Sequence, residues 1–205
     1  AQQSQLLALR RSEEAREISR ALLGQLARFL RAAGQKRPAG GVPRYRLSLG
    51  VRAVGLRGDT LCGDCGTSFQ CGVTQYVLLC DGMGTGSGAQ SDAQEAISVL
   101  QSLLTLGFDA MDAAAMLNEL YVLRGDGCFS TVDLLEMDLC TGEGALYKWG
   151  AAPSYLKKGG TVKKIGTASP PPGLGVGEEH RAERVGLSLQ RGEQLVLTTD
   201  GIPEA

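Results

Sequence analysis

An apolar run leads directly into an aspartate and a string of glycines over residues 76–88, which read YVLLCDGMGTGSG. The run Tyr76–Cys80 has the length and composition of a buried strand. A second apolar run, LVLTT, ends in the same pair at Asp200-Gly201. An Asp-Gly pair alone is usually a turn. Two buried strands that both end in this pair instead indicate two aspartates placed at strand ends.

A third aspartate lies upstream in the same hairpin. The residues around Thr67–Gln70 and Tyr76–Cys80 predict two strands that turn at Cys71–Val73. In a regular hairpin of this kind, residues whose numbers sum to 145 face each other, so Asp64 lies opposite Asp81. Carboxylates this close disfavour each other's charge unless a cation lies between them, and hard divalent cations prefer oxygen ligands. With Asp200 they predict a metal site at one sheet edge, in particular a two-metal site.

The rest of the chain predicts a helical pair between groups of strands. Apolar periodicity places the helices over residues 93–104 and 109–123, with Gly107 between them. Further strands are expected over residues 45–53, 129–139, 145–150, 154–157, 161–165, 180–187 and 194–199. Successive hairpins without regular βαβ alternation predict an antiparallel α+β sandwich rather than a parallel doubly wound sheet.

Composition excludes several classes of function. The chain has 205 residues, of which 43% are hydrophobic, enough for one core. A net charge of −1 and 5% aromatic residues argue against a nucleic-acid partner. The single histidine, His180, argues against histidine-based metal sites, and no apolar run is long enough to span a membrane.

Six cysteines leave one rival metal site open. Cys62 and Cys65 have the C-x-x-C spacing of a zinc site, and Cys71 and Cys80 could complete it. The second pair is split and falls in predicted strands, so we favour free thiols in a reducing compartment. The zinc content of the purified protein distinguishes the two interpretations.

Charge divides the chain into a basic arm and an acidic body. Residues 1–37 hold eight basic and three acidic residues, and residues 4–33 have a helical apolar period. We expect a linker or regulatory helix over 1–37, a Pro- and Gly-containing linker over 38–43 and a folded domain over 44–205. The helix either packs on the domain or connects it to an upstream region and dimerises.

Five stretches in order resemble motifs of the PPM-type (type 2C) metal-dependent protein phosphatases. They are Gly63-Asp64, Cys80–Gly86 (CDGMGTG), Phe129–Leu134 (FSTVDL), Gly150–Tyr155 (GAAPSY) and Thr199–Ile202 (TDGI). The resemblance extends from about residue 44 to 205. Within that family, the sequence is similar to the phosphatase domain of the stage II sporulation protein E type.

The resemblance implies an αββα sandwich with two divalent cations at one edge, Mn²⁺ first and Mg²⁺ as the alternative. Asp81 would bridge both ions with the Gly82 carbonyl as a further ligand, while Asp64 and Asp200 would each serve one ion. These aspartates are then both metal ligands and catalytic residues. A metal-bridging water would attack phosphoserine on a regulatory protein, by resemblance an anti-sigma-factor antagonist in sporulation.

The resemblance also implies a setting for the domain. It implies a cytoplasmic location, with the parent protein tethered to a membrane through a region upstream of residue 1. A homodimer would form through the helices over 88–123 or through the N-terminal helix.

One departure from the family pattern concerns activity. The family carries a further aspartate ligand downstream of Asp-Gly-Ile, whereas this sequence ends at Ala205. We therefore expect the domain to lack its C-terminal segment, and the 205-residue chain to be weakly active or inactive. The alternative function is a non-catalytic phosphoprotein-binding signalling module of the same fold.

Overall fold

A computed structural model describes residues 41–55, 62–166, 169–174 and 182–201, together with Arg10, Arg20 and Gly24. Apart from those three residues, the helix predicted over 4–33 lies outside the described residues. Residues 38–40 of the predicted linker and His180 also lie outside them.

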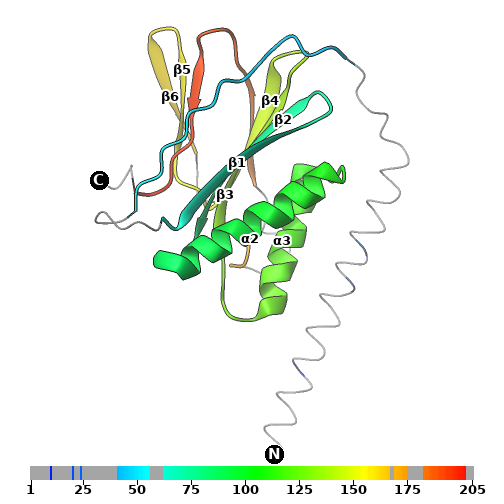
Figure 1. The fold of residues 1–205 in the computed structure, drawn as a ribbon, viewed down its shortest axis with the longest axis vertical. Helices are drawn as coiled ribbons and strands as arrows, with labels where there is room; N and C mark the ends of the chain where they lie inside the picture. Colours follow the sequence, from blue (N-terminus) through cyan, green and yellow to red (C-terminus); the bar gives the residue numbers. More distant parts are fainter. Residues whose placement is uncertain are drawn as a thin grey trace, which may run out of the picture.

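Two antiparallel sheets and one pair of helices form the described domain (Figure 1). The first sheet has five strands in the order β1 (Asp64–Cys71), β2 (Thr74–Gly82), β3 (Ser130–Asp138), β4 (Glu143–Trp149) and β7 (Glu183–Ser188). The second has three strands in the order β6 (Thr161–Ile165), β5 (Ser154–Lys158) and β8 (Gln194–Val196). This architecture confirms the predicted antiparallel α+β sandwich.

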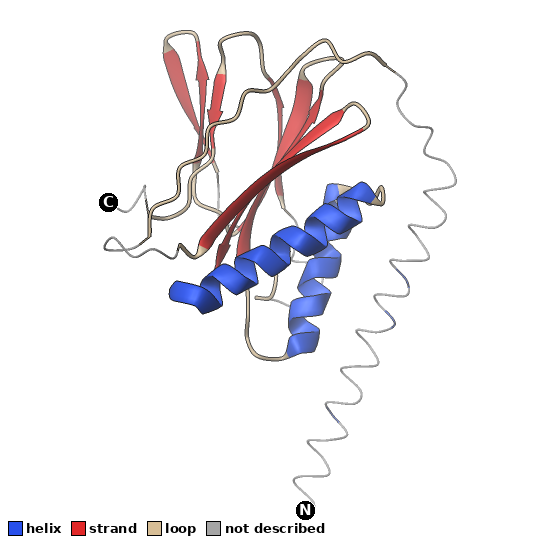
Figure 2. Cartoon of the chain, viewed as in Figure 1, coloured by secondary structure: helices blue, strands red, loops and turns tan. Residues whose placement is uncertain are grey.

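The helices cover one face of the five-stranded sheet (Figure 2). They are α2 (Gly86–Thr105) and α3 (Ala110–Arg124). The helix α3 begins after Asp109, whose side chain accepts a hydrogen bond from the Asp112 amide at 2.9 Å, and ends at Gly125 with φ 65°. Within the described residues, the helical layer of the expected αββα arrangement is present on this side alone.

The five-stranded sheet is buried on both faces. Alternate strand residues point to opposite sides. Leu78, Leu134 and Trp149 therefore pack against the helices, and Leu135 and Leu146 pack against the second sheet. The two clusters are the cores on either side of this sheet.

The prediction of a strand over residues 45–53 is wrong. The amides of Arg44 and Tyr45 both donate to the Leu139 carbonyl, at 2.7 and 2.9 Å, but no strand forms over the described residues 41–55. Figure 1 shows this segment as a coil that runs along the sandwich. Its alternating apolar residues do not share a buried face, because Leu47 packs between the sheets whereas Val51 is 84% exposed.

The other predicted elements are found with shifts at their ends, the largest in α2, which begins at Gly86 rather than at residue 93. The strand β8 ends at Val196 rather than Thr199, so the last residues before Asp200 are extended chain without a ladder partner among the described residues. Within the described part of the chain, no helix is both long and apolar enough to cross a membrane.

Candidate metal centre

Asp64 and Asp81 lie opposite each other at the open end of the β1–β2 hairpin, as the sequence predicts. Partial burial, the charge of Asp64, a hydrogen bond with the Asp64 carboxyl group and the charge of Asp200 together raise the pKa of Asp81 to about 7. Two carboxyl groups held together in this way share a proton or a cation. The hairpin therefore builds an acidic pair that divalent cations would relieve.

Asp200 reaches this pair from the other sheet. After β8 the chain continues through Thr198 and Thr199, and Thr199 Oγ1 donates to Asp64 Oδ2 at 2.8 Å. Thr198 Oγ1 donates to the Pro153 carbonyl at 2.8 Å. The two hydroxyls fix the segment that carries Asp200 on both sides. Thr199 is not among the site residues that the sequence predicts, because its only signal is a hydroxyl directly before the Asp-Gly pair.

Two glycines let the first turn of α2 approach the acidic pair. The Gly82 amide donates to the Gly63 carbonyl at 3.4 Å, which extends the hairpin past the two aspartates. A Cβ atom on Gly82 would overlap the Ala89 carbonyl oxygen of α2, and one on Gly63 would lie 3.1 Å from the Ala89 Cβ. The backbone of α2 therefore lies directly against the turn that follows Asp81.

The donor set suits hard divalent cations. Asp64 and Asp81 are in contact, whereas Asp200 acts on Asp81 through its charge from farther away. In the described part of the chain, no three acidic, histidine or cysteine side chains are gathered tightly enough to enclose an ion by themselves. The groups at this edge are carboxylates, a hydroxyl and backbone carbonyls, which are ligands for Mg²⁺ or Mn²⁺ rather than zinc. The residues therefore fit divalent cations, and the ligand roles of Asp64, Asp81, Gly82 and Asp200 stay predictions.

The cysteines give the zinc alternative little support. Cys65 and Cys80 are register partners in the β1–β2 hairpin, and Cys80 is completely buried in the core beneath the helices. Burial raises the pKa of both thiols above the ordinary value. Zinc is bound by thiolates, so this environment disfavours the form that a zinc site needs.

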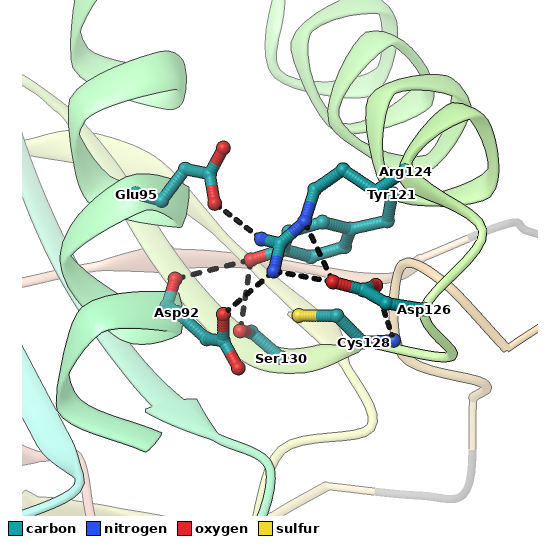
Figure 3. A network of polar contacts seen from close by, with 7 residues as sticks. All are labelled: Asp92, Glu95, Tyr121, Arg124, Asp126, Cys128 and Ser130. Carbon is teal, nitrogen blue, oxygen red and sulfur yellow. Dashed lines mark hydrogen bonds and ion pairs between the residues drawn. The ribbon is translucent and has the colours of Figure 1, made fainter. Parts of the chain in front are cut away.

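An arginine joins the two helices near this edge. The guanidinium of Arg124 in α3 pairs with Asp92 at 3.2 Å and with Glu95, both in α2, and with Asp126 at 2.7 Å (Figure 3). It also lies over the Tyr121 ring, 5.7 Å from the ring centre. These contacts fix α3 to α2 through partly exposed charges.

Tyr121 extends the same group of contacts to the sheet. Its hydroxyl donates to the Asp92 carbonyl at 3.1 Å and lies 2.9 Å from Ser130 Oγ (Figure 3). Ser130 begins β3 and is the register partner of Gly82 in β2. The helical pair is therefore linked by side chains to the strand next to the acidic turn.

The chain matches the stage II sporulation protein E (SpoIIE) family over residues 73–205. It is 32% identical over 167 residues to stage II sporulation protein E of Bacillus subtilis (strain 168), covering 80% of this chain and 20% of that protein. It is 30% identical over 162 residues to the protein of the same name in Priestia megaterium, covering 78% of this chain and 27% of the relative. The chain thus spans less than a third of the curated relatives it matches.

Solved structures agree with the sequence relatives. The PP2C phosphatase domain of SpoIIE from Bacillus subtilis, solved with a fragment of its regulatory domain, matches with a TM-score of 0.71 and 31% identity, over 80% of this chain and 48% of that chain. A serine/threonine phosphatase from S. agalactiae shares the fold, with a TM-score of 0.61 and 13% identity over 74% of this chain and 78% of that one. With this fold and these relatives, the chain belongs to the stage II sporulation protein E (SpoIIE) family.

Proposed function

We propose that this domain is a metal-dependent protein serine/threonine phosphatase. The observation that carries the proposal is the acidic edge, where Asp64 and Asp81 face each other in the β1–β2 hairpin and the charge of Asp200 acts on Asp81. The fold shared with a PP2C phosphatase domain supports it. From the family we further propose a cytoplasmic site of action and, as substrate, phosphoserine on a regulatory protein, an anti-sigma-factor antagonist of sporulation.

The acidic edge would hold two divalent cations, Mn²⁺ or Mg²⁺. Bound there, they would supply a water nucleophile at neutral pH and neutralise the charge of the phosphoryl oxygens. From the family pattern we assign Asp81, which faces Asp64 across the hairpin, as a ligand that both ions would share. The Gly82 carbonyl would add a ligand beside it, and the Thr199 hydroxyl orients the Asp64 carboxylate.

Four of the six thiols lie in environments that disfavour a competing nucleophile. Cys80 and Cys128 are buried, and burial raises the pKa of Cys128 to about 12. The pKa values of Cys65 and Cys140 are raised as well, first by burial. A thiolate is the nucleophile in cysteine-based catalysis. These environments favour the metal-dependent reaction over a phosphocysteine route.

Phosphate release from a serine-phosphorylated protein tests the proposal. The assay uses this chain and the full-length product of its gene, with Mn²⁺ and with EDTA. We expect Asp81→Asn to lower turnover by more than about 100-fold, because loss of an outer partner of a ligand alone costs about 10–100-fold. The matched control is Glu143→Gln, which removes an exposed carboxylate far from the site in sequence. Turnover that survives both EDTA and Asp81→Asn would contradict the proposal.

A second candidate function is a non-catalytic phosphoprotein-binding module of the same fold. The observation that favours it is that the described residues bring two carboxylates into contact rather than three. Such a module would retain a serine-phosphorylated protein in EDTA and release no phosphate when Mn²⁺ is added. The same assay therefore separates the two functions.

We also propose that the helices over residues 88–123 form a homodimer surface. Leu120 and Leu123 lie one turn apart on α3 and are 37% and 40% exposed. Sedimentation of Leu120→Lys/Leu123→Lys should show a monomer where the unchanged protein is a dimer. The control Val162→Lys changes an exposed apolar residue of β6, outside this surface. A dimer that persists in the helix variant would point instead to the N-terminal helix.

A further inference from the structure

A lysine and an aspartate form an ion pair in the interior, between the two sheets. Lys148 of β4 is 0% exposed and Asp133 of β3 is 1% exposed, and the Lys148 Nζ contacts Asp133 Oδ1. The two residues are register partners in the β3–β4 pair. They share a sheet face with Leu135 and Leu146, which pack against the three-stranded sheet. The pair therefore points toward the second sheet.

The lysine reaches across to that second sheet. Its Nζ donates to Ser154 Oγ at 2.8 Å, and Ser154 is the buried first residue of β5. The preceding residue, Pro153, accepts the hydrogen bond from Thr198, two residues before Asp200. Lys148 is thus linked through Ser154 and Pro153 to the segment that carries Asp200.

The aspartate is close to the other half of the centre. Thr131 is the register partner of Asp81 in the β2–β3 pair, and Asp133 lies two residues farther along the same strand face. At about 3.3 Å per residue, this places Asp133 roughly 7 Å along the strand from the Asp81 row. The ion pair therefore joins the sheet with Asp64 and Asp81 to the second sheet, whose strand β8 leads into the segment with Asp200.

Stability alone does not account for this pair. Two charges taken from water lose hydration, and replacement of such pairs by apolar residues is often neutral or stabilising. Asp133 Oδ2 has no hydrogen-bond partner among the described residues, so the pairing is incomplete. Burial raises the pKa of Asp133 to about 6 even though Lys148 lowers it. Leu156 and Ile165 belong to the apolar cluster on this side of the sheet, so apolar side chains in place of Lys148 and Asp133 would suit these surroundings.

We propose that Lys148, held by Asp133, is a positioning residue that sets the spacing of the two sheets and so places Asp200 against Asp64 and Asp81. Apolar contacts between sheets allow sliding, whereas directional hydrogen bonds select one geometry. The consequence for metal binding rests on the proposed function. The spacing itself is a property of the metal-free fold, so it is measured separately.

Amide hydrogen exchange of the metal-free protein tests the spacing. Ser154→Ala removes the hydroxyl that Lys148 reaches and leaves the ion pair intact. We expect amide exchange in β5 and β8 to rise about tenfold relative to β1–β4, as for loss of one hydrogen bond. Ser154→Thr keeps a hydroxyl at this position and should keep exchange slow.

The matched control Ser169→Ala removes a hydroxyl that donates to the Lys148 backbone carbonyl at 2.7 Å, and should leave amide exchange in β8 unchanged. Unchanged exchange in Ser154→Ala, or a uniform rise over both sheets, would overturn the proposal.

A calorimetric Mn²⁺ titration of the full-length product then tests the consequence for the centre. The double variant Lys148→Met/Asp133→Leu replaces the pair with apolar side chains. We expect its melting temperature to equal or exceed that of the unchanged protein, while its Mn²⁺ affinity is about tenfold weaker. Unchanged affinity together with slow β8 exchange would overturn the positioning role. If the unchanged protein itself binds no Mn²⁺, the proposed function fails, and the exchange experiment still decides the spacing role.

Discussion

Among single side chains, Asp81 should make the metal-free fold sensitive to pH. Its pKa is about 7 in the folded protein and near the ordinary 3.8 when unfolded, so the folded state holds more protons between these values. Stability therefore falls as pH rises through this window and stays low above it. In EDTA at about pH 8, urea denaturation should show Asp81→Asn more stable than the unchanged protein by about 1–2 kcal/mol, after allowance for solvent screening.

The same comparison near pH 4 provides the internal control, because Asp81 is then protonated in the folded state and the difference should shrink toward zero. Glu143→Gln should change stability little at either pH, since Glu143 is exposed. A stability difference that does not depend on pH would show that Asn acts through packing rather than charge.

Thr199 should determine how well Asp64 binds a cation. Its hydroxyl donates to Asp64 Oδ2, and loss of such an outer partner typically weakens metal binding about 10–100-fold. Calorimetric titration with Mn²⁺ should therefore show about tenfold weaker binding by Thr199→Val. Thr199→Ser keeps the hydroxyl and should bind as the unchanged protein does. Equal affinity in the valine variant would mean that the hydroxyl does not orient the carboxylate.

The site residues that the sequence predicts are those with local signals. The facing of Asp64 and Asp81 is confirmed because a tight turn at Gly72 fixes the register of its own hairpin. The contact of Thr199 with Asp64 joins residues 135 apart, and no local pattern encodes it. The buried Lys148 looks, in sequence, like any polar residue of a half-exposed strand.

The contact between α2 and the acidic turn gives a prediction about packing. Gly82→Ala places a Cβ against the Ala89 carbonyl, so the helix backbone must move, at a cost of about 1–3 kcal/mol. Gly88→Ala is the matched control, since a Cβ there meets nothing within 4 Å and alanine favours a helix by up to about 1 kcal/mol. The midpoint of urea denaturation should therefore fall for Gly82→Ala and rise for Gly88→Ala. Equal stability of the Gly82 variant would contradict the tight approach.

The stability that Arg124 contributes by linking α3 to α2 should depend on salt concentration. Its side chain is 32% exposed and meets three carboxylates, so Arg124→Met should destabilise the domain by about 1 kcal/mol in dilute buffer. In about 1 M NaCl the difference should shrink, because exposed charges are screened. Arg191→Met, at an exposed arginine of a turn, is the control and should have little effect. A loss that does not respond to salt would assign the effect to packing on Tyr121.

Elements were predictable where the sequence carries both a period and a stop signal. The helices α2 and α3 follow an apolar stripe and end at glycine-containing turns, and most strands lie between turn residues. The strand predicted over 45–53 has the period without a partner, since alternation does not show whether a neighbouring strand edge is available. The amides of Arg44 and Tyr45 donate to the Leu139 carbonyl, and no strand ladder continues from them over the described residues up to 55.

For the molecule as a whole, cation binding should raise the resistance to heat. A ligand that binds only the folded state stabilises it by about 2.7 kcal/mol at 100 times its dissociation constant. Thermal denaturation in excess Mn²⁺ should therefore give a higher melting temperature than in EDTA. Asp81→Asn should show no such increase. An equal increase in both proteins would place the bound ions elsewhere.

The overall class was predictable because the order of strands, helical pair and strands restricts the architecture. The distance between the sheets could not be predicted, because it depends on contacts between residues of different sheets, such as Lys148 with Ser154. Sequence patterns identify which face of a strand is apolar. They do not show which opposing residue meets that face.

The contact between Thr199 and Asp64 also orders events during synthesis. The β1–β2 hairpin with both its aspartates leaves the ribosome well before Thr199 and Asp200, because 135 residues separate Asp64 from Thr199. A nascent chain therefore carries a self-repelling acidic pair without its hydroxyl donor or third carboxylate. On the proposed function, capture of cations would wait until translation has passed β8, and a partly made protein would not yet hydrolyse phosphate esters.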